Sequence, residues 1–148
     1  MDIELTKNKK AYFDYEVVDT YDAGIVLKGY EAKSIRAGKM QLKGGFISFR
    51  NEEAWMENVL ISPYQPKNQP EESGQRRLKL LLQKKQILKI INQSEEAGMT
   101  VIPLKAIVKD HRIKIVIGLC RGKKKFDKRE SIKKRELDRS TRHQFKTR

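Results

Sequence analysis

Alternating apolar and polar residues predict short β-strands through most of the first 120 positions. In Tyr12–Asp19 every second residue is apolar and two carboxylates lie between them, a pattern typical of a half-buried strand. The triplet at residues 22–24 (DAG) predicts a turn, after which a second strand begins at Ile25. Residues 6–10 (TKNKK) are interpreted as a basic lead-in to these strands.

A first β-hairpin is predicted downstream. Its strands are Phe46–Arg50 and Ala54–Ile61, and its turn is formed by residues 51–53 (NEE). We expect Trp55 in the second strand to be buried or half buried, because a large aromatic ring contributes most where it is removed from water.

A second hairpin is predicted from Thr100–Lys109 and Arg112–Cys120, joined at residues 110–111. Isoleucine and leucine occupy alternate positions of the last strand and are expected to face inward, so Lys114 points outward. Pro103 lacks a backbone N–H and indicates a sheet edge or a β-bulge.

Helical periodicity appears in two places. Gly29–Gly38 is expected to form one or two helical turns that end at Gly38 in a left-handed conformation. Residues 76–98 keep an apolar spacing of three to four, which predicts a helix or two helical pieces. Between these regions, Ser62–Gln75 contains three of the four prolines and is predicted to be a long loop.

Together these elements favour a mostly β fold with helices. About six short strands and about three helices, connected largely through hairpins, predict an OB-type (oligonucleotide-binding) six-stranded antiparallel β-barrel. Residues 1–121 would form this single domain, and residues 122–148 would form a basic C-terminal tail.

The distribution of charge changes this picture of the tail. The net charge is +14, and residues 121–148 contribute 13 Lys and Arg against 4 Asp and Glu. Such an excess points to nucleic acid, with an anionic membrane surface as the weaker competitor because the tail lacks an apolar face. The tail has too few apolar residues to fold alone, but the pairs Glu130–Lys134 and Asp138–Arg142 favour a helix on binding.

Candidate catalytic chemistry is sparse. The single cysteine, Cys120, is interpreted as a core residue rather than a reactive thiol, and His111 and His143 have no nucleophile nearby in sequence. No phosphate-cradling glycine motif occurs, so we expect neither an enzyme nor a bound cofactor or metal. The N-terminus has no apolar signal segment, and a cytoplasmic monomer is expected.

Nucleic-acid binding is the remaining interpretation. Surface Lys and Arg neutralise phosphates and release counterions, and they recur here at the ends of predicted barrel strands. The candidates are Lys7, Lys9, Lys10, Lys33, Arg36, Arg76, Arg77, Lys79, Lys114, Arg121, Lys123, Lys124 and Lys125.

Four ordered blocks carry a family resemblance. They are NKKA at residues 8–11, YDAGIVLKGYEAKSIRAGK at 21–39, RRLKLLL at 76–82 and IGLCRGKKKFDKR at 117–129. Together they resemble the small protein B (SmpB) family, the bacterial proteins that bind tmRNA, also called SsrA RNA.

The resemblance implies a function in ribosome rescue. A protein of this family binds the tRNA-like domain of tmRNA and brings it to stalled ribosomes for trans-translation, together with elongation factor Tu. Its barrel replaces the missing anticodon arm, and its tail folds as a helix in the decoding centre and empty mRNA channel. The family catalyses no reaction.

The resemblance also assigns residues. The tmRNA face would include Asp22, Leu81 and Lys114, and the α-helical block would contribute Glu31, Lys33, Ser34 and Arg36. Without the resemblance, Asp22 would be interpreted as a turn residue that caps its own backbone. The tail residues assigned to the decoding centre are Phe126, Asp127, Lys128, Arg129, Ile132, Lys133, Lys134 and Arg135.

Two other functions remain open at this point. A general rRNA-binding or ribosomal structural protein would share the basic composition, and it would stay on ribosomes through a salt wash. An RNA-processing enzyme would degrade RNA, but the sequence offers it no plausible acid–base or metal constellation.

Overall fold

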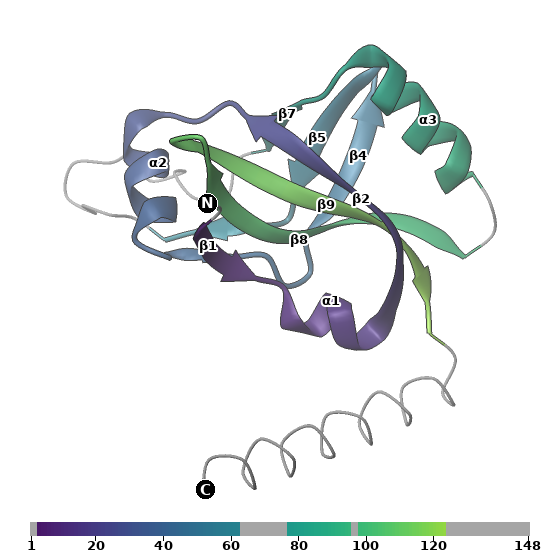
Figure 1. Cartoon of the computed structure of the whole chain (residues 1–148), viewed down its shortest axis with the longest axis horizontal. Helices are drawn as coiled ribbons and strands as arrows, with labels where there is room; N and C mark the ends of the chain where they lie inside the picture. Colours follow the sequence, from purple (N-terminus) through teal and green to yellow (C-terminus); the bar gives the residue numbers. More distant parts are fainter. Residues whose placement is uncertain (1–2, 63–76, 96–97, 124–148) are drawn as a thin grey trace, which may run out of the picture.

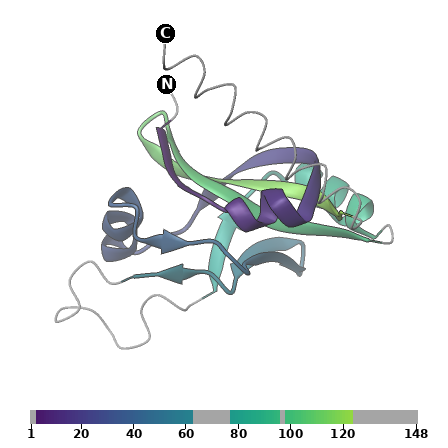
Figure 2. The same ribbon diagram turned by 90° about the horizontal axis from the view of Figure 1, so that it is seen from below.

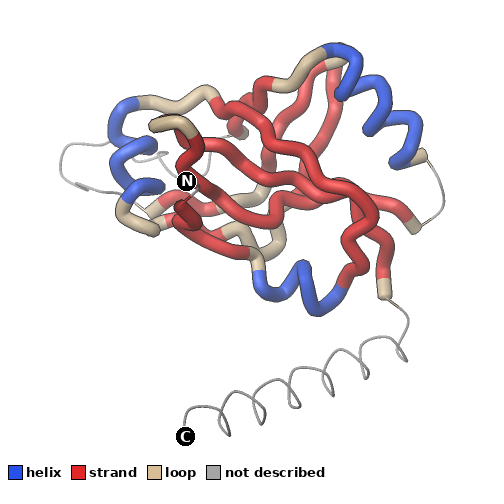
Figure 3. The backbone as a smooth tube through the Cα atoms, viewed as in Figure 1, coloured by secondary structure: helices blue, strands red, loops and turns tan. Residues whose placement is uncertain are grey.

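The computed structural model describes residues 3–62, 77–95 and 98–123, and these form a strongly curved antiparallel sheet with helices around it (Figures 1 and 3). The main sheet has seven strands in the order β1-β8-β9-β2-β7-β5-β4, and β3 and β6 form a separate two-stranded ribbon. In chain order the elements are β1 (Ile3–Lys7), α1 (Lys9–Asp14), β2 (Tyr15–Ile25), α2 (Gly29–Arg36), β3 (Met40–Gln41), β4 (Phe46–Arg50), β5 (Glu53–Glu57), β6 (Leu60–Ile61), β7 (Leu78–Leu81), α3 (Lys84–Ser94), β8 (Met99–Lys109) and β9 (Arg112–Gly122).

Both predicted hairpins are confirmed, but the predicted strand Ala54–Ile61 is too long. The chain turns at Asn58, whose φ is 60°, so β5 ends at Glu57 and Leu60–Ile61 form β6, which pairs with β3. β4 pairs with β5 and β8 pairs with β9, each through a two-residue turn. Asn51 and Glu52 have φ angles of 52° and 60°, and Asp110 and His111 have 52° and 65°, as tight hairpin turns require. Pro103 lies at a register shift in β8, which confirms the predicted bulge.

The start of the chain differs from its prediction in three ways. The basic lead-in at residues 6–10 is divided between strand β1, which pairs with β8 and ends at Lys7, and helix α1, which begins at Lys9. Residues 12–14 are helical rather than extended, because the Asn8 side chain accepts a hydrogen bond from the Ala11 N–H at 3.1 Å and caps α1. The predicted turn at residues 22–24 is wrong, since β2 continues through Gly24 with partners on both sides.

The helical predictions are confirmed in part. α2 ends before Gly38, whose φ of 76° is the expected left-handed conformation, and α3 confirms the longer helical piece. The leucine-rich start of that region is instead strand β7. Leu78 and Leu80 are buried on one side, and Lys79 lies between them. The burial therefore follows the two-residue period of a strand rather than the 3.6-residue period of a helix.

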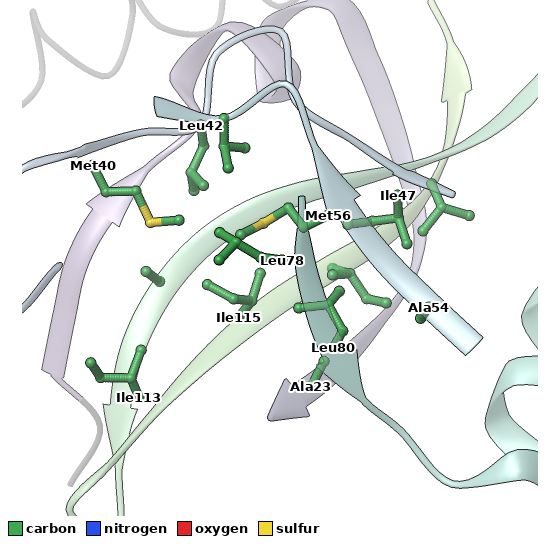
Figure 4. Packing of buried hydrophobic residues seen from close by; sticks show 14 of the residues in the cluster. Ala23, Met40, Leu42, Ile47, Ala54, Met56, Leu78, Leu80, Ile113 and Ile115 are labelled. Carbon is green, nitrogen blue, oxygen red and sulfur yellow. The ribbon is translucent and has the colours of Figure 1, made fainter. Parts of the chain in front are cut away.

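The core lies inside the curve of the sheet (Figure 4). Buried side chains from β2, β5, β7 and β9 meet there, with Ile115, Met56 and Leu80 among the least exposed. The inward isoleucines of β9 are confirmed, and Trp55 is half buried as expected. Cys120 is buried in a second cluster beneath Ala11 of α1.

A mostly β fold with three helices is therefore confirmed for the described residues, but a closed six-stranded barrel is not. The main sheet has seven strands and keeps two different ends, β1 and β4, which are not paired with each other. The main sheet has seven strands rather than six because β1 and β7 form strands that the sequence does not predict, whereas residues 15–25 form one strand instead of two. The tail from residue 124 onward and the predicted loop at residues 63–76 lie outside the described residues.

Candidate nucleic-acid interface

Three of the predicted RNA-binding residues lie together on the outer side of the sheet. Gly24 in the central strand β2 lies opposite Leu81 of β7 on one side and Lys114 of β9 on the other. Asp22 is two residues away from Gly24 and so shares this outward side, whereas Ala23 between them is buried in the core. The register alone therefore places Asp22, Leu81 and Lys114 within one small area.

Lys109 completes this area, and sequence reasoning missed it. Its Nζ lies 3.1 Å from Oδ2 of Asp22, and both side chains are about two-fifths exposed. An ion pair this exposed is worth roughly 0–1 kcal/mol, so both groups can exchange partners with little loss of stability. The alternation could have revealed Lys109, because Ile107 is paired with Lys114 and Lys109 is two residues further on. We call Asp22, Leu81, Lys109 and Lys114 the sheet face.

The sheet face also has an apolar member held at close range. Leu81 is 53% exposed, although it lies in the middle of a sheet. A Cβ at Gly24 would lie 3.2 Å from Cβ of Leu81, which is closer than most such contacts. Glycine at this position therefore leaves room for the Leu81 side chain to pack over β2. An exposed apolar side chain between charged groups suits contact with a ribose or the face of a base.

The predicted residues of α2 separate into two kinds. Lys33 and Arg36 are exposed, and Nη2 of Arg36 donates to the backbone oxygen of His111 at 3.2 Å, which ties the helix to the β8–β9 turn.

The other two predicted residues of α2, Glu31 and Ser34, are buried, with 1% and 0% of their surface exposed. Oε1 of Glu31 accepts the Lys28 N–H at 2.8 Å and caps the helix. Their burial favours a positioning role for these two side chains, and direct RNA contact by them stays a prediction.

The basic residues around α1 lie apart from the sheet face. Lys9 and Lys10 are exposed on this helix, and Nζ of Lys10 is 3.9 Å from Oδ2 of Asp14. The end of the described body is attached to the same helix, because Nζ of Lys123 donates to the backbone oxygen of Tyr12 at 3.2 Å. Arg121 is exposed nearby on β9.

The cysteine beneath α1 is chemically quiet. Burial raises the pKa of the Cys120 thiol to about 11, so almost none of it is thiolate at neutral pH. This environment agrees with its interpretation as a core residue.

The remaining predicted positions are partnered or not described. Lys79 faces Glu53 at 3.3 Å, and Arg77 faces Glu57 at 3.3 Å with its guanidinium 5.9 Å from the centre of the Trp55 ring. The predicted residues outside the described ranges are Arg76, Lys124, Lys125, Phe126, Asp127, Lys128, Arg129, Ile132, Lys133, Lys134 and Arg135.

The described residues contain neither a candidate metal site nor a helix that could cross a membrane. Residues 3–62, 77–95 and 98–123 contain no group of three or more His, Cys, Asp or Glu side chains placed to hold a metal ion. None of the three described helices has the length and apolar character needed to cross a membrane.

Known proteins resemble this chain along most of its length. The family described as SmpB protein matches residues 5–147. The SsrA-binding protein of Streptococcus sanguinis is 49% identical over 142 residues, covering 96% of this chain and 92% of the relative. That of Enterococcus faecalis is 49% identical over 135 residues, covering 91% and 88%.

A solved structure is similar as well. A chain described under "tmRNA-SmpB: a journey to the center of the bacterial ribosome" superposes with a TM-score of 0.68 and 38% identity. The match covers 86% of this chain and 93% of that one.

Proposed function

The chain belongs to the SmpB family, and from this premise we propose that it binds SsrA RNA and acts with that RNA on the ribosome in trans-translation. The sheet face carries the proposal. In a protein of net charge +14, an exposed carboxylate held among lysines is hard to explain by charge attraction alone. It is easily explained by recognition of one particular RNA surface.

Each member of the sheet face has a chemical role in this proposal. Lys109 and Lys114 neutralise phosphates and release counterions. Asp22 accepts hydrogen bonds from a base edge or a 2′-hydroxyl, the group that distinguishes RNA from DNA. Leu81 covers an apolar part of the nucleotide. Exchange of the exposed Asp22–Lys109 ion pair for RNA contacts costs little, so the free protein is ready to bind.

We further propose a division of labour along the chain. Residues 1–121 bind the tRNA-like domain in place of an anticodon arm, and residues 122–148 act in the decoding centre and empty mRNA channel. The anchoring of Lys123 on α1 supports this boundary, because it ties the last described residue to the body. Elongation factor Tu accompanies the complex in the cytoplasm, and the protein contributes binding rather than catalysis.

A relation to OB-type barrels belongs to the same proposal. The described sheet is antiparallel and curls so far that β4 lies beside β8, although no ladder joins them. A Cβ at Gly45, just before β4, would lie 3.1 Å from Cγ of Pro103 in β8. Side-chain packing rather than hydrogen bonding would then complete the barrel.

A binding comparison tests the proposed function. The full chain is titrated against the tRNA-like domain of SsrA RNA and against an unrelated RNA hairpin of equal length, at the same salt concentration. We expect clearly tighter binding to the tRNA-like domain, whereas equal affinities would reduce the protein to a general RNA binder. A chain truncated after Lys125 should keep this preference and lose ribosome rescue.

A further inference from the structure

A second basic surface lies away from the sheet face, between α1 and the segment that follows β3. A groove there is lined by Lys7, Lys9, Lys10 and Lys43, and its described lining contains no carboxylate. All four lysines are exposed. Figure 2 views the molecule from this side, with α1 in front and the β3–β6 ribbon beside the main sheet. We call these four residues the lysine groove.

Asn8 holds the two walls of the lysine groove together. Its side chain is buried, and its Nδ2 donates to the backbone oxygens of Leu42 at 3.2 Å and Pro103 at 3.0 Å. The Asn8 N–H donates to the oxygen of Leu104 at 2.7 Å. Thr6 adds a bond from its hydroxyl to the oxygen of Met40 at 3.1 Å. Lysines from distant parts of the sequence are thus fixed at one groove rather than scattered over a loop.

An exposed aromatic ring lies next to the lysine groove. Phe46 is 44% exposed at the start of β4, and it lines two hollows that adjoin the groove. One hollow shares Lys43 with the groove and the other shares Lys10. Two carboxylates lie nearby: Glu57 pairs with Arg77, and Asp14 lies 3.9 Å from the groove lysine Lys10 in an exposed pair that is easily exchanged.

We propose that the lysine groove and Phe46 form a second RNA-binding surface, which takes a single-stranded segment. The lysines track successive phosphates, and Phe46 stacks on an unpaired base. Single-stranded RNA fits better than a duplex because paired bases are not free to stack on a side chain. This inference goes beyond the proposed contact with the tRNA-like domain, and its failure would leave that contact standing.

The test measures binding of a labelled oligouridine of about a dozen nucleotides to full-length variants. The double variant Lys9→Gln/Lys43→Gln removes two groove charges. Its matched control, Lys85→Gln/Lys89→Gln, removes two exposed charges from α3, which lies far from α1 in Figure 1. We expect the groove variant to bind at least about fivefold more weakly than its control, with a log–log salt slope smaller by about 1.4.

Two further arms define the surface. Phe46→Leu keeps an apolar side chain but removes the ring, and a loss of about fivefold or more is expected. Three results would overturn the proposal. They are equal oligouridine affinity of the groove and control double variants, unchanged oligouridine affinity of the Phe46→Leu protein, and equal binding of oligouridine and its duplex with oligoadenine.

Discussion

The sheet face and the lysine groove are two basic surfaces built in different ways. On the sheet face, one carboxylate and one leucine lie among lysines on neighbouring strands of the main sheet, and Asp22 already binds Lys109. The lysine groove has one sign of charge and is held together by a buried asparagine. A mixed surface discriminates between RNAs because every group needs its partner, whereas a uniform one attracts any phosphate chain. The difference predicts selectivity for the first and tolerance for the second.

The largest expected effect concerns the support beneath the lysine groove. Cys120 is buried under α1, and burial raises the pKa of its thiol to about 11. At pH 8 the thiolate fraction is then lower by about a hundredfold or more than in an unfolded chain. A thiol reagent should therefore modify the native protein at least about a hundredfold more slowly than the protein in urea. Fast modification of the native chain would show that α1 does not stay packed on the sheet.

The next effect breaks the lysine groove while leaving the sheet face in place. Asn8→Ala leaves the oxygens of Leu42 and Pro103 without their side-chain donor, which should cost about 2 kcal/mol of unfolding free energy. Urea unfolding of this variant is compared with Asn92→Ala, an exposed position on α3 that should change stability by less than about 0.5 kcal/mol. Equal stabilities would mean that Asn8 does not join the two walls.

A smaller effect sharpens the role of the sheet face. Lys114→Ala should weaken binding of the tRNA-like domain and reduce the log–log salt slope by about one, because one phosphate contact is lost. The control is Lys85→Ala on α3, which should leave the slope unchanged. A slope that falls equally in both variants would indicate a loss of general charge rather than of a contact.

The sequence revealed the hairpins and helices wherever one period dominated. It failed at β7, because the leucines of residues 78–82 fit both a helical and a strand period and only burial of Leu78 and Leu80 decides between them. The turn predicted at residues 22–24 is wrong, because the sequence alone does not distinguish a buried glycine inside a strand from a glycine in a turn. Neighbouring strands select the extended form there, and they act through contacts that are distant in sequence.

The two surfaces were accessible from sequence to different degrees. Strand alternation and charge already made Lys114 a candidate, the family resemblance added Asp22, and the register then shows why the two belong together. The sequence does not predict Lys43 as a binding residue, because no motif or element pattern near it indicates a site. Its place beside Lys7 depends on the bonds of Asn8 and Thr6, which no local pattern predicts.

The central claim, that the sheet face recognises SsrA RNA rather than merely attracting it, is tested most directly by Asp22→Ala. The substitution removes a negative charge, so simple attraction predicts tighter binding to the tRNA-like domain, whereas recognition by Asp22 predicts weaker binding. Glu16→Ala is the matched control, since it makes the same charge change at another exposed position of β2. We predict that Asp22→Ala binds the tRNA-like domain about tenfold more weakly than Glu16→Ala. Equal or tighter binding by Asp22→Ala would contradict the account.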